Sequence, residues 1–191
     1  MMEGSCRSIC WTSHWNRKRE DVGLEHLLLR EREADSIVLA FDDEHGPFRL
    51  CYRLTWDDEW RVRTAELVAA TAETSRLLTL HTDGHGHWHY DDGRPIAELE
   101  GCLDIDIWPT PFTNSLPLLR KPLSVGERQE FHVAWVYAPE LTVHRQHQAY
   151  THLPDGRYLF ESLDGSGFKA ELPLDDDGIV RDYPNLFQRV G

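Results

Sequence analysis

Two aspartates on one expected strand are the residues of this sequence best placed to do chemistry. Asp104 and Asp106 stand two residues apart in the segment 101–108, Gly-Cys-Leu-Asp-Ile-Asp-Ile-Trp. In an extended strand, residues two apart share a face at a Cα spacing of ~6.5 Å, so both carboxylates point to the same side. Arg61 and Arg63 have the same spacing further upstream. We therefore expect two cations to meet two anions on neighbouring strands.

Three interpretations of this cluster stay open. It can be a partly buried ion-pair network that orders the strands, because charged residues are rarely buried unless they are paired. It can be a polar recognition patch in an apolar cavity, where arginines and carboxylates hold sugar hydroxyls or an anionic headgroup. It can also be a hydrolase site for a glycoside or ester that uses Asp104 and Asp106. In that case arginines beside both carboxylates would keep both ionised and leave no proton donor.

A run of histidines raises a metal hypothesis. His85, His87 and His89 alternate along the chain and would share one face if their segment were a strand. Neutral imidazoles at such positions can converge on zinc or nickel. An Asp-Gly pair just before them is a strong turn signal, however, and an extended strand would set the outer histidines ~13 Å apart. An exposed polar hairpin is the favoured interpretation, and we expect no metal and no cofactor.

Charge and hydropathy limit the classes of partner. The chain has 191 residues and a formal net charge of −13, which opposes binding to nucleic-acid phosphates and to anionic bilayers. The basic run at 17–19 is followed at once by acidic residues and is typical of a solvated turn. No stretch is apolar for long enough to be a transmembrane segment, and the amino terminus lacks the apolar core of a signal peptide. We expect a soluble, cytoplasmic protein that binds no nucleic acid, while the oligomeric state stays open.

Alternation of period two predicts the elements that must hold these residues. Residues 48–56 place Phe, Leu, Tyr, Leu and Trp on one face and Arg, Cys, Arg and Thr on the other. Further runs are bounded by Gly, Pro or Asp clusters, and segments so short and so closely joined favour antiparallel meanders. These runs are 60–70, 76–82, 130–137, 141–150, 157–162 and 168–174.

One segment breaks this pattern. The four prolines in residues 109–122 have no backbone N–H to donate to a neighbouring strand, so this segment is expected to be irregular. Thr110 or Thr113 can cap a short helical turn there, so we expect a connection that crosses the sheet or closes one end of it. No internal repeat and no flexible linker divides the chain. The sequence therefore predicts a single all-β domain over residues 1–191, built of antiparallel strands with one irregular proline-rich crossing segment.

Aromatic residues are numerous enough to line a cavity as well as to fill a core. The chain has seven tryptophans, six tyrosines and seven phenylalanines. Trp60, Trp88 and Tyr150 stand next to charged or glycine positions in the sequence or its expected strands. Rings beside polar groups suit contacts with a sugar or a polar headgroup.

With these residues in view, the chain resembles the putative glycolipid-binding family, a bacterial family formerly described as a domain of unknown function. The likeness covers nearly the whole chain, and its most specific part is the segment 101–106 running into 110–117, Thr-Pro-Phe-Thr-Asn-Ser-Leu-Pro. Two features depart from the pattern: Leu119 precedes Arg120 where a pair of arginines is expected, and the three histidines are peculiar to this chain. Further matches are residues 23–25, 60–63 and 83–88, Gln148, Tyr150, Gly178 and 183–184.

The resemblance implies a spiral β-roll whose interior holds an amphiphile such as a glycolipid. We therefore expect a binding protein more than an enzyme. Two alternatives stay open: a hydrolase that uses Asp104 and Asp106, and an interaction protein without a ligand. The residues expected to hold the ligand are Trp60, Arg61, Arg63, Trp88, Asp104, Asp106, Thr113, Asn114, Arg120 and Tyr150.

Overall fold

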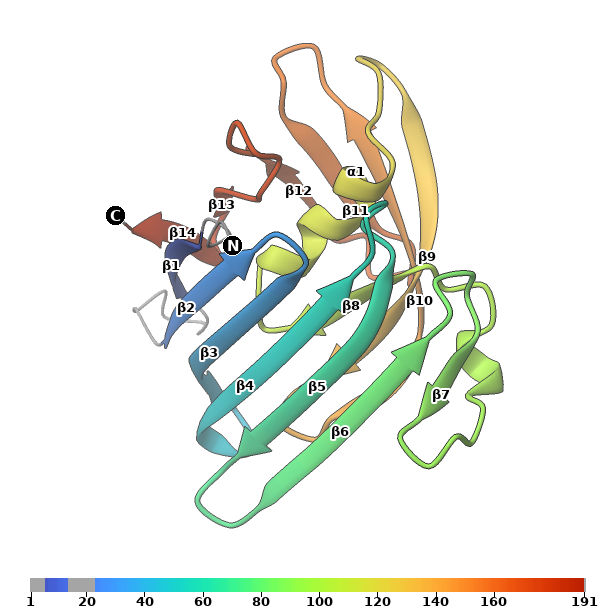
Figure 1. The fold of residues 1–191 in the computed structure, drawn as a ribbon. Coiled ribbons are helices and arrows are strands. Elements are labelled where there is room, and N and C mark those ends of the chain that lie inside the picture. Colours follow the sequence, from blue (N-terminus) through green and yellow to red (C-terminus); the bar gives the residue numbers. More distant parts are fainter. Residues whose placement is uncertain (1–5, 14–22, 191) are drawn as a thin grey trace.

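The structure, a computed structural model, describes residues 6–13 and 23–190 of the chain, so the basic run at 17–19 lies outside the described residues. Over the described ranges the strands form two sheets, and the larger one is antiparallel throughout, with the order β13-β14-β1-β2-β3-β4-β5-β6-β7 (Figure 1). Its strands are β1 (Arg7–Ser13), β2 (Gly23–Arg30), β3 (Glu33–Asp42), β4 (Gly46–Trp56), β5 (Val62–Ala70), β6 (Ser75–Thr82), β7 (Trp88–Tyr90), β13 (Asp182–Tyr183) and β14 (Phe187–Val190).

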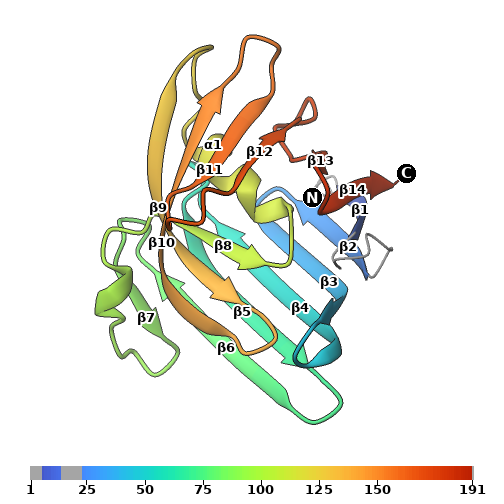
Figure 2. The same cartoon turned by 180° about the vertical axis from the view of Figure 1, so that it is seen from behind.

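The smaller sheet lies against one side of the larger one, and Figure 2 shows it in front of the larger sheet. Its order is β12-β11-β10-β9-β8. One continuous cluster of buried apolar residues contains side chains of both sheets, so the two sheets share a core. The strands of this sheet are β8 (Asp104–Trp108), β9 (Arg128–Tyr137), β10 (Thr142–His152), β11 (Tyr158–Ser162) and β12 (Lys169–Leu172).

The all-β fold is confirmed, and β4 shows why the residue pattern predicts it. Phe48, Leu50, Tyr52, Leu54 and Trp56 are all buried, whereas the residues between them are exposed or half-buried. Side chains of a strand point alternately to the two faces of its sheet, so this strand turns an apolar face to the core and a polar face outward.

One strand pair departs from the expected antiparallel order. Strands β8 and β9 run parallel, with Asp104 opposite Val133 and Trp108 opposite Tyr137. Parallel neighbours need a crossover connection of a dozen or more residues. The proline-rich segment supplies that connection, since it leads from the end of β8 across to the start of β9.

The crossing segment itself is irregular, as predicted, and it is buried. It contains the 3-10 helix η2 (Phe112–Ser115) and the helix α1 (Leu116–Arg120), which lie between the two sheets in Figure 1. Thr110 and Thr113 do not cap either helix, because the residues at the N-caps are Pro111 and Ser115. Thr110 Oγ1 instead accepts a hydrogen bond from Phe112 N at 3.1 Å in the turn before η2. A third short helix, η1 (Ala97–Leu99), precedes β8. No helix in the described part of the chain is long and apolar enough to cross a membrane.

The strand predicted over 60–70 begins later than expected. β5 starts at Val62, because Trp60 adopts a positive φ of 60° and the pairing of β4 with β5 shifts between Thr55 and Trp56. The Trp60 ring stacks on Trp56 with centroids 4.9 Å apart. Arg61 therefore belongs to a turn that precedes the strand.

Candidate ligand cavity

A cavity of about 430 Å³ lies against one face of the five-stranded sheet, next to β13 and β14. Strand pairing explains the shared face, since Asp106 stands opposite Trp135 and Gln148 opposite Ser162. Pockets that hold small molecules usually measure ~300–1,000 Å³. The lining residues are Asp106, Ile107, Trp108, Thr110, Asn114, Trp135, Tyr137, Gln146, Gln148, Phe160, Ser162, Asp164, Ser166, Phe168, Tyr183, Leu186 and Phe187.

Aromatic rings make up much of the cavity wall. Trp108 packs edge-on against Phe187 with centroids 6.2 Å apart, and Tyr183 stacks on Phe187 at the same distance. Trp135 and Tyr137 lie next to one another on β9, with centroids 5.4 Å apart. Flat apolar faces of this kind pack well against the C–H faces of sugars and against acyl chains.

Asp106 is the charged group at the base of this cavity. Its side chain is half-buried, and Oδ2 accepts a hydrogen bond from Gln148 Nε2 at 2.5 Å while Oδ1 accepts one from Thr113 Oγ1 at 2.9 Å. Burial raises the pKa of Asp106, and the hydrogen bonds from Gln148 and Thr113 oppose that rise. No ion pair joins it to a basic side chain among the described residues.

A chain of amide and hydroxyl groups extends from Asp106 into the protein. Asn114 Nδ2 donates to Tyr150 Oη at 3.1 Å, and Gln148 Nε2 also donates to Gln146 Oε1 at 2.8 Å. Tyr150 is fully buried. Three residues expected at the site from sequence, Thr113, Asn114 and Tyr150, thus meet Asp106 directly or through Gln148.

Asp104 shares a strand face with Asp106, as predicted, but its surroundings differ. Arg120 forms a two-point ion pair with it, from Nε to Oδ1 at 2.8 Å and from Nη2 to Oδ2 at 2.7 Å. The Asp104 side chain is fully buried and that of Arg120 is 13% exposed. Burial raises the pKa of Asp104, and the guanidinium group opposes that rise. This pair is a structural contact outside the cavity lining.

The expected meeting of Arg61 and Arg63 with the two aspartates was wrong. Arg61 pairs with Glu59, and Arg63 donates to Asp83 O at 2.6 Å. Both side chains lie on the surface, with 35% and 45% of their area exposed. The physical reason is strand order: the neighbour of β8 is β9, and β5 lies in the other sheet.

Two tryptophans expected at the site also lie outside the cavity lining. Trp60 packs on Trp56 at the start of β5. Trp88 is buried in the core, and its Nε1 donates to Cys102 O at 2.7 Å.

The histidines do not form the strand face that a metal site would need. His85 and His87 lie in a loop, because β7 begins only at Trp88. His87 Nδ1 is 2.6 Å from Asp83 Oδ2, and the His89 ring stacks on His81. Across residues 6–13 and 23–190 no cluster of three or more His, Cys, Asp or Glu side chains is arranged to hold a metal.

The structure does not bring Asp104 and Asp106 together as an accessible pair of carboxylates, which the hydrolase alternative requires. Both oxygens of Asp104 accept hydrogen bonds from Arg120, and the side chain has no exposed surface from which to reach a substrate. Glycosidase mechanisms of the usual kind need two accessible carboxyl groups across one bond. Asp106 alone faces the cavity, so the geometry does not favour catalysis by this pair.

A third buried carboxyl lies behind the cavity wall. Glu25 Oε1 accepts hydrogen bonds from Tyr52 Oη at 2.6 Å, from Ser36 Oγ at 2.8 Å and from Thr110 Oγ1 at 2.9 Å. Its Oε2 has no hydrogen-bond partner among the described residues. Burial raises the pKa of Glu25 to about 7, against the lowering effect of the three hydroxyl groups. Because Thr110 also lines the cavity, it connects the two regions.

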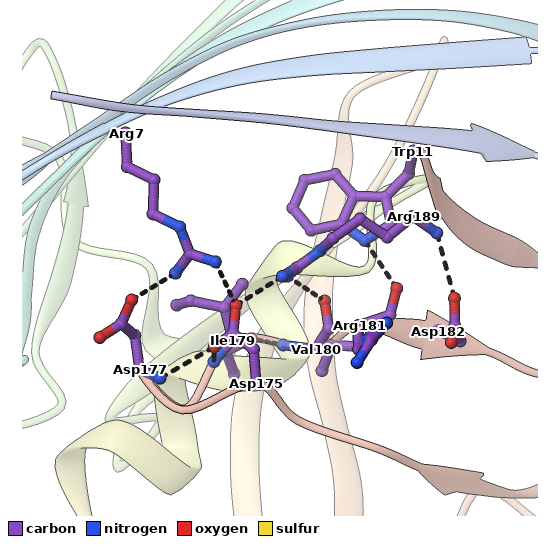
Figure 3. Close-up of polar contacts among 10 residues, drawn as sticks. Arg7, Trp11, Asp175, Asp177, Ile179, Val180, Arg181, Asp182 and Arg189 are labelled. Carbon is purple, nitrogen blue, oxygen red and sulfur yellow. Dashed lines mark hydrogen bonds and ion pairs between the residues drawn. The ribbon is translucent and has the colours of Figure 1, made fainter. Parts of the chain in front are cut away.

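Ion pairs connect β1 and β14, two neighbouring strands of the large sheet, to Asp175 in the segment between β12 and β13. Figure 3 shows Arg7 of β1 and Arg189 of β14 converging on Asp175, each at 2.5 Å from Oδ2. Burial raises the pKa of Asp175, but the guanidinium groups of Arg189 and Arg7 outweigh it and hold the pKa below its usual value. Trp11 Nε1 donates to Arg181 O at 3.1 Å beside this cluster. The wall that carries Tyr183 and Phe187 is therefore held in place by charge as well as by strand pairing.

A second depression, of about 500 Å³, lies on the outer side near the ends of β3, β4 and β5. It is more open than the cavity beside Asp106. Its only polar side chains are Arg49 and Thr71, so it lacks a converging set of polar groups. The cavity beside Asp106 is the better candidate site.

Several lining residues were missed because no motif marks them. Trp135, Tyr137 and Phe160 lie in runs whose alternation was recognised, but alternation alone does not say which face meets a cavity. Phe187 and Leu186 come from the carboxyl-terminal end, which reaches the site only because β14 pairs with β1. A signal that could have found part of the site is the pair Gln146 and Gln148, two amides that share a strand face with Tyr150.

Comparison with known proteins assigns the family. The family model described as putative glycolipid-binding matches residues 12–189. The chain is similar to the crystal structure of a DUF1089 family protein from Pseudomonas aeruginosa, with 44% sequence identity, a TM-score of 0.86 and coverage of 90% of this chain and 94% of that chain. The comparison with curated proteins gave no match. The chain therefore belongs to the putative glycolipid-binding family.

Proposed function

We propose that this protein binds an amphiphile with a sugar headgroup, and that the headgroup occupies the cavity beside Asp106. The single observation that carries this proposal is the composition of the cavity wall. Seven aromatic side chains line it, and five polar side chains converge in the same space from β8, the crossing segment and β10. Binding sites for small molecules combine a mainly apolar wall with a few fixed polar groups in this way. These five side chains are Asp106, Thr110, Asn114, Gln146 and Gln148, and Ser162, Asp164 and Ser166 add polar groups elsewhere on the lining.

The arrangement of the wall supports an amphiphile over a wholly polar sugar. Phe168 lines the cavity and is 41% exposed, so an apolar surface continues from the cavity to solvent. A cavity of about 430 Å³ accommodates a headgroup and leaves the acyl or alkyl chain to follow this surface outward. The description of the family points to the same ligand class. Binding without catalysis and a cytoplasmic location remain predictions from the sequence.

Two measurements test the proposal. Native mass spectrometry and lipid extraction of protein purified from its own host should recover an amphiphile with a sugar headgroup. Isothermal titration of the apo protein with octyl glucoside below its critical micelle concentration should then show one site per chain. The proposal would be contradicted if repeated preparations contained no bound amphiphile and the titration with octyl glucoside showed no heat of binding.

A matched pair of tryptophan variants locates the site. Trp135→Ala removes a ring from the cavity wall and should weaken octyl glucoside binding about tenfold or more, because stacking rings dominate such contacts. Trp60→Ala removes a ring that stacks on Trp56 outside the cavity lining and should leave the affinity unchanged. Equal losses in the two variants would place the ligand elsewhere.

A further inference from the structure

Over residues 6–13 and 23–190, the side chains that line the cavity carry negative charge and no positive charge. Asp106 lies at the base of the cavity and Asp164 at its exposed edge, and this described lining contains no lysine, arginine or histidine. A hydrogen bond from the Ser166 side chain and one from its backbone N–H lower the pKa of Asp164, so this carboxylate is ionised at neutral pH. Arg120, which pairs with the neighbouring Asp104 on β8, is held by both oxygens of that carboxylate. A phosphate or carboxylate headgroup would find no counter-charge on the described lining.

Asp106 has unused capacity to accept hydrogen bonds. Each of its oxygens takes one hydrogen bond, from Gln148 and from Thr113. A carboxylate oxygen has two lone pairs, so one acceptor position on each oxygen is left for a ligand. Both existing donors are neutral, and burial disfavours the ionised form of the group. A positively charged donor in the cavity would supply the charge that the protein itself does not.

The rings next to Asp106 suit the same kind of ligand. Trp135 is opposite Asp106 in the strand pairing, and Trp108 lies two residues further along β8 on the same face. Adjacent strands are ~4.8 Å apart, so both indoles flank the carboxylate. A cation beside an aromatic face is attracted by the negative charge distribution of the ring, and tryptophan gives the strongest effect. The carboxylate and the rings therefore favour the same ligand group.

The charge of the whole chain acts in the same direction. Its formal net charge is −13, and a cavity with low-dielectric walls concentrates the field of such a charge distribution. The field attracts a cationic headgroup and repels an anionic one.

We propose that the headgroup recognised by this cavity carries an amine, as in an amphiphile with an amino sugar, and that Asp106 is the counter-charge of that amine. This inference rests on the proposed function, because it names the headgroup of the amphiphile. The amine lies between the carboxylate and the indoles of Trp108 and Trp135. Asp164 adds a weaker attraction at the cavity edge.

A series of octyl glycosides with one alkyl chain tests this inference. The series contains octyl glucoside, octyl glucosaminide, its N-acetylated form and octyl glucuronide, which differ in headgroup charge. Isothermal titration at neutral pH should show the glucosaminide binding at least about tenfold more tightly than the glucoside. N-acetylation should remove this gain, and the glucuronide should bind most weakly. Equal affinities for the glucosaminide and the glucoside would overturn the inference while leaving the proposed function intact.

Two variants test which carboxylate recognises the amine. Asp106→Asn keeps the size of the side chain and should reduce glucosaminide affinity to that of the glucoside. Asp164→Asn lies on the exposed loop and should lower glucosaminide affinity about twofold to threefold, since exposed charges are screened. An unchanged amine preference in Asp106→Asn would contradict the assignment. If Asp106→Asn does not fold, the comparison of the glucosaminide with its N-acetylated form still tests the preference for an amine. If no glycoside of the series binds, the proposed function is overturned as well.

Discussion

Asp104 and Asp106 lie two residues apart on the same face of the same strand, and yet they are placed in opposite ways. Asp104 is sealed from solvent and uses both oxygens on Arg120. Asp106 is half-buried at the base of a cavity and has only neutral partners, Gln148 and Thr113. The comparison shows that neighbouring side chains decide what a carboxylate does: the first one holds the fold together, and the second one is available to a ligand.

The largest expected effect comes from breaking the sealed pair. Arg120→Leu leaves the Asp104 carboxylate buried without its partner, and we expect the free energy of unfolding to fall by about 3–5 kcal/mol in urea denaturation. The double variant Asp104→Leu with Arg120→Leu should recover most of that loss, because no charge is then left buried. A loss below about 1 kcal/mol in Arg120→Leu would show that Asp104 is not the structural member of the two.

Glu25 is buried like Asp104, but no basic side chain pairs with it in the described part of the chain. Its pKa rises from 4.5 to about 7 in the folded protein, so the folded state binds the proton more tightly than the unfolded chain. The contribution of Glu25 to the free energy of unfolding is fully present below about pH 4.5 and decreases as the pH rises. Above about pH 7 this contribution, about 3 kcal/mol, is lost.

Glu25→Gln removes the ionisable group and keeps an oxygen that can accept from Tyr52, Ser36 and Thr110. Unfolding in urea at several pH values between 5 and 8 should therefore show the variant gaining stability relative to the wild-type protein as the pH rises. Parallel curves for the two proteins would mean that Glu25 stays in one protonation state over this range.

Thr113 tests how the fold holds Asp106 in position. Its hydroxyl donates to Asp106 and accepts from Ile107 N at 3.0 Å. Thr113→Val leaves the buried N–H and a carboxylate oxygen without this partner, and should lower the free energy of unfolding by about 2 kcal/mol. Thr113→Ser keeps the hydroxyl and should lose much less. Similar losses in both variants would attribute the effect to the methyl group and its packing.

The smallest effect is expected from the arginines that the sequence placed beside the two aspartates. Arg61→Gln with Arg63→Gln should change the free energy of unfolding by no more than about 0.5 kcal/mol, because both side chains are exposed. Octyl glucoside affinity should be unchanged. A loss of affinity comparable to that of Trp135→Ala would restore the interpretation in which these arginines hold the ligand.

The sequence predicted which residues share a face more reliably than which faces meet. Alternation placed Asp104 and Asp106 on one side of a strand, and the structure agrees. The predicted neighbouring strand, which carries Arg63, was wrong because an alternation of period two carries no information on the order of strands in a sheet. The parallel pairing of β8 with β9, which brings Trp135 beside Asp106, depends on a crossover whose path no local pattern specifies.

The crossing segment illustrates the other limit. Its prolines showed that it cannot be a central strand, and its threonines and Asn114 were recognised as candidate site residues. Their actual partners, Asp106 and Tyr150, are fixed by tertiary packing. Phe187 was missed for the same reason, since it reaches the cavity only when the two ends of the chain pair as β1 and β14.

The most direct test of the ligand position follows the tryptophan indole N–H signals in a nitrogen–proton correlation spectrum during titration with octyl glucosaminide. We expect shifts of Trp108 and Trp135, which line the cavity, and none of Trp60 and Trp88, which do not. Asp106→Asn should weaken the titration without moving it to other signals. Shifts confined to Trp60 or Trp88, with Trp108 and Trp135 unchanged, would contradict the claim that the cavity beside Asp106 holds the ligand.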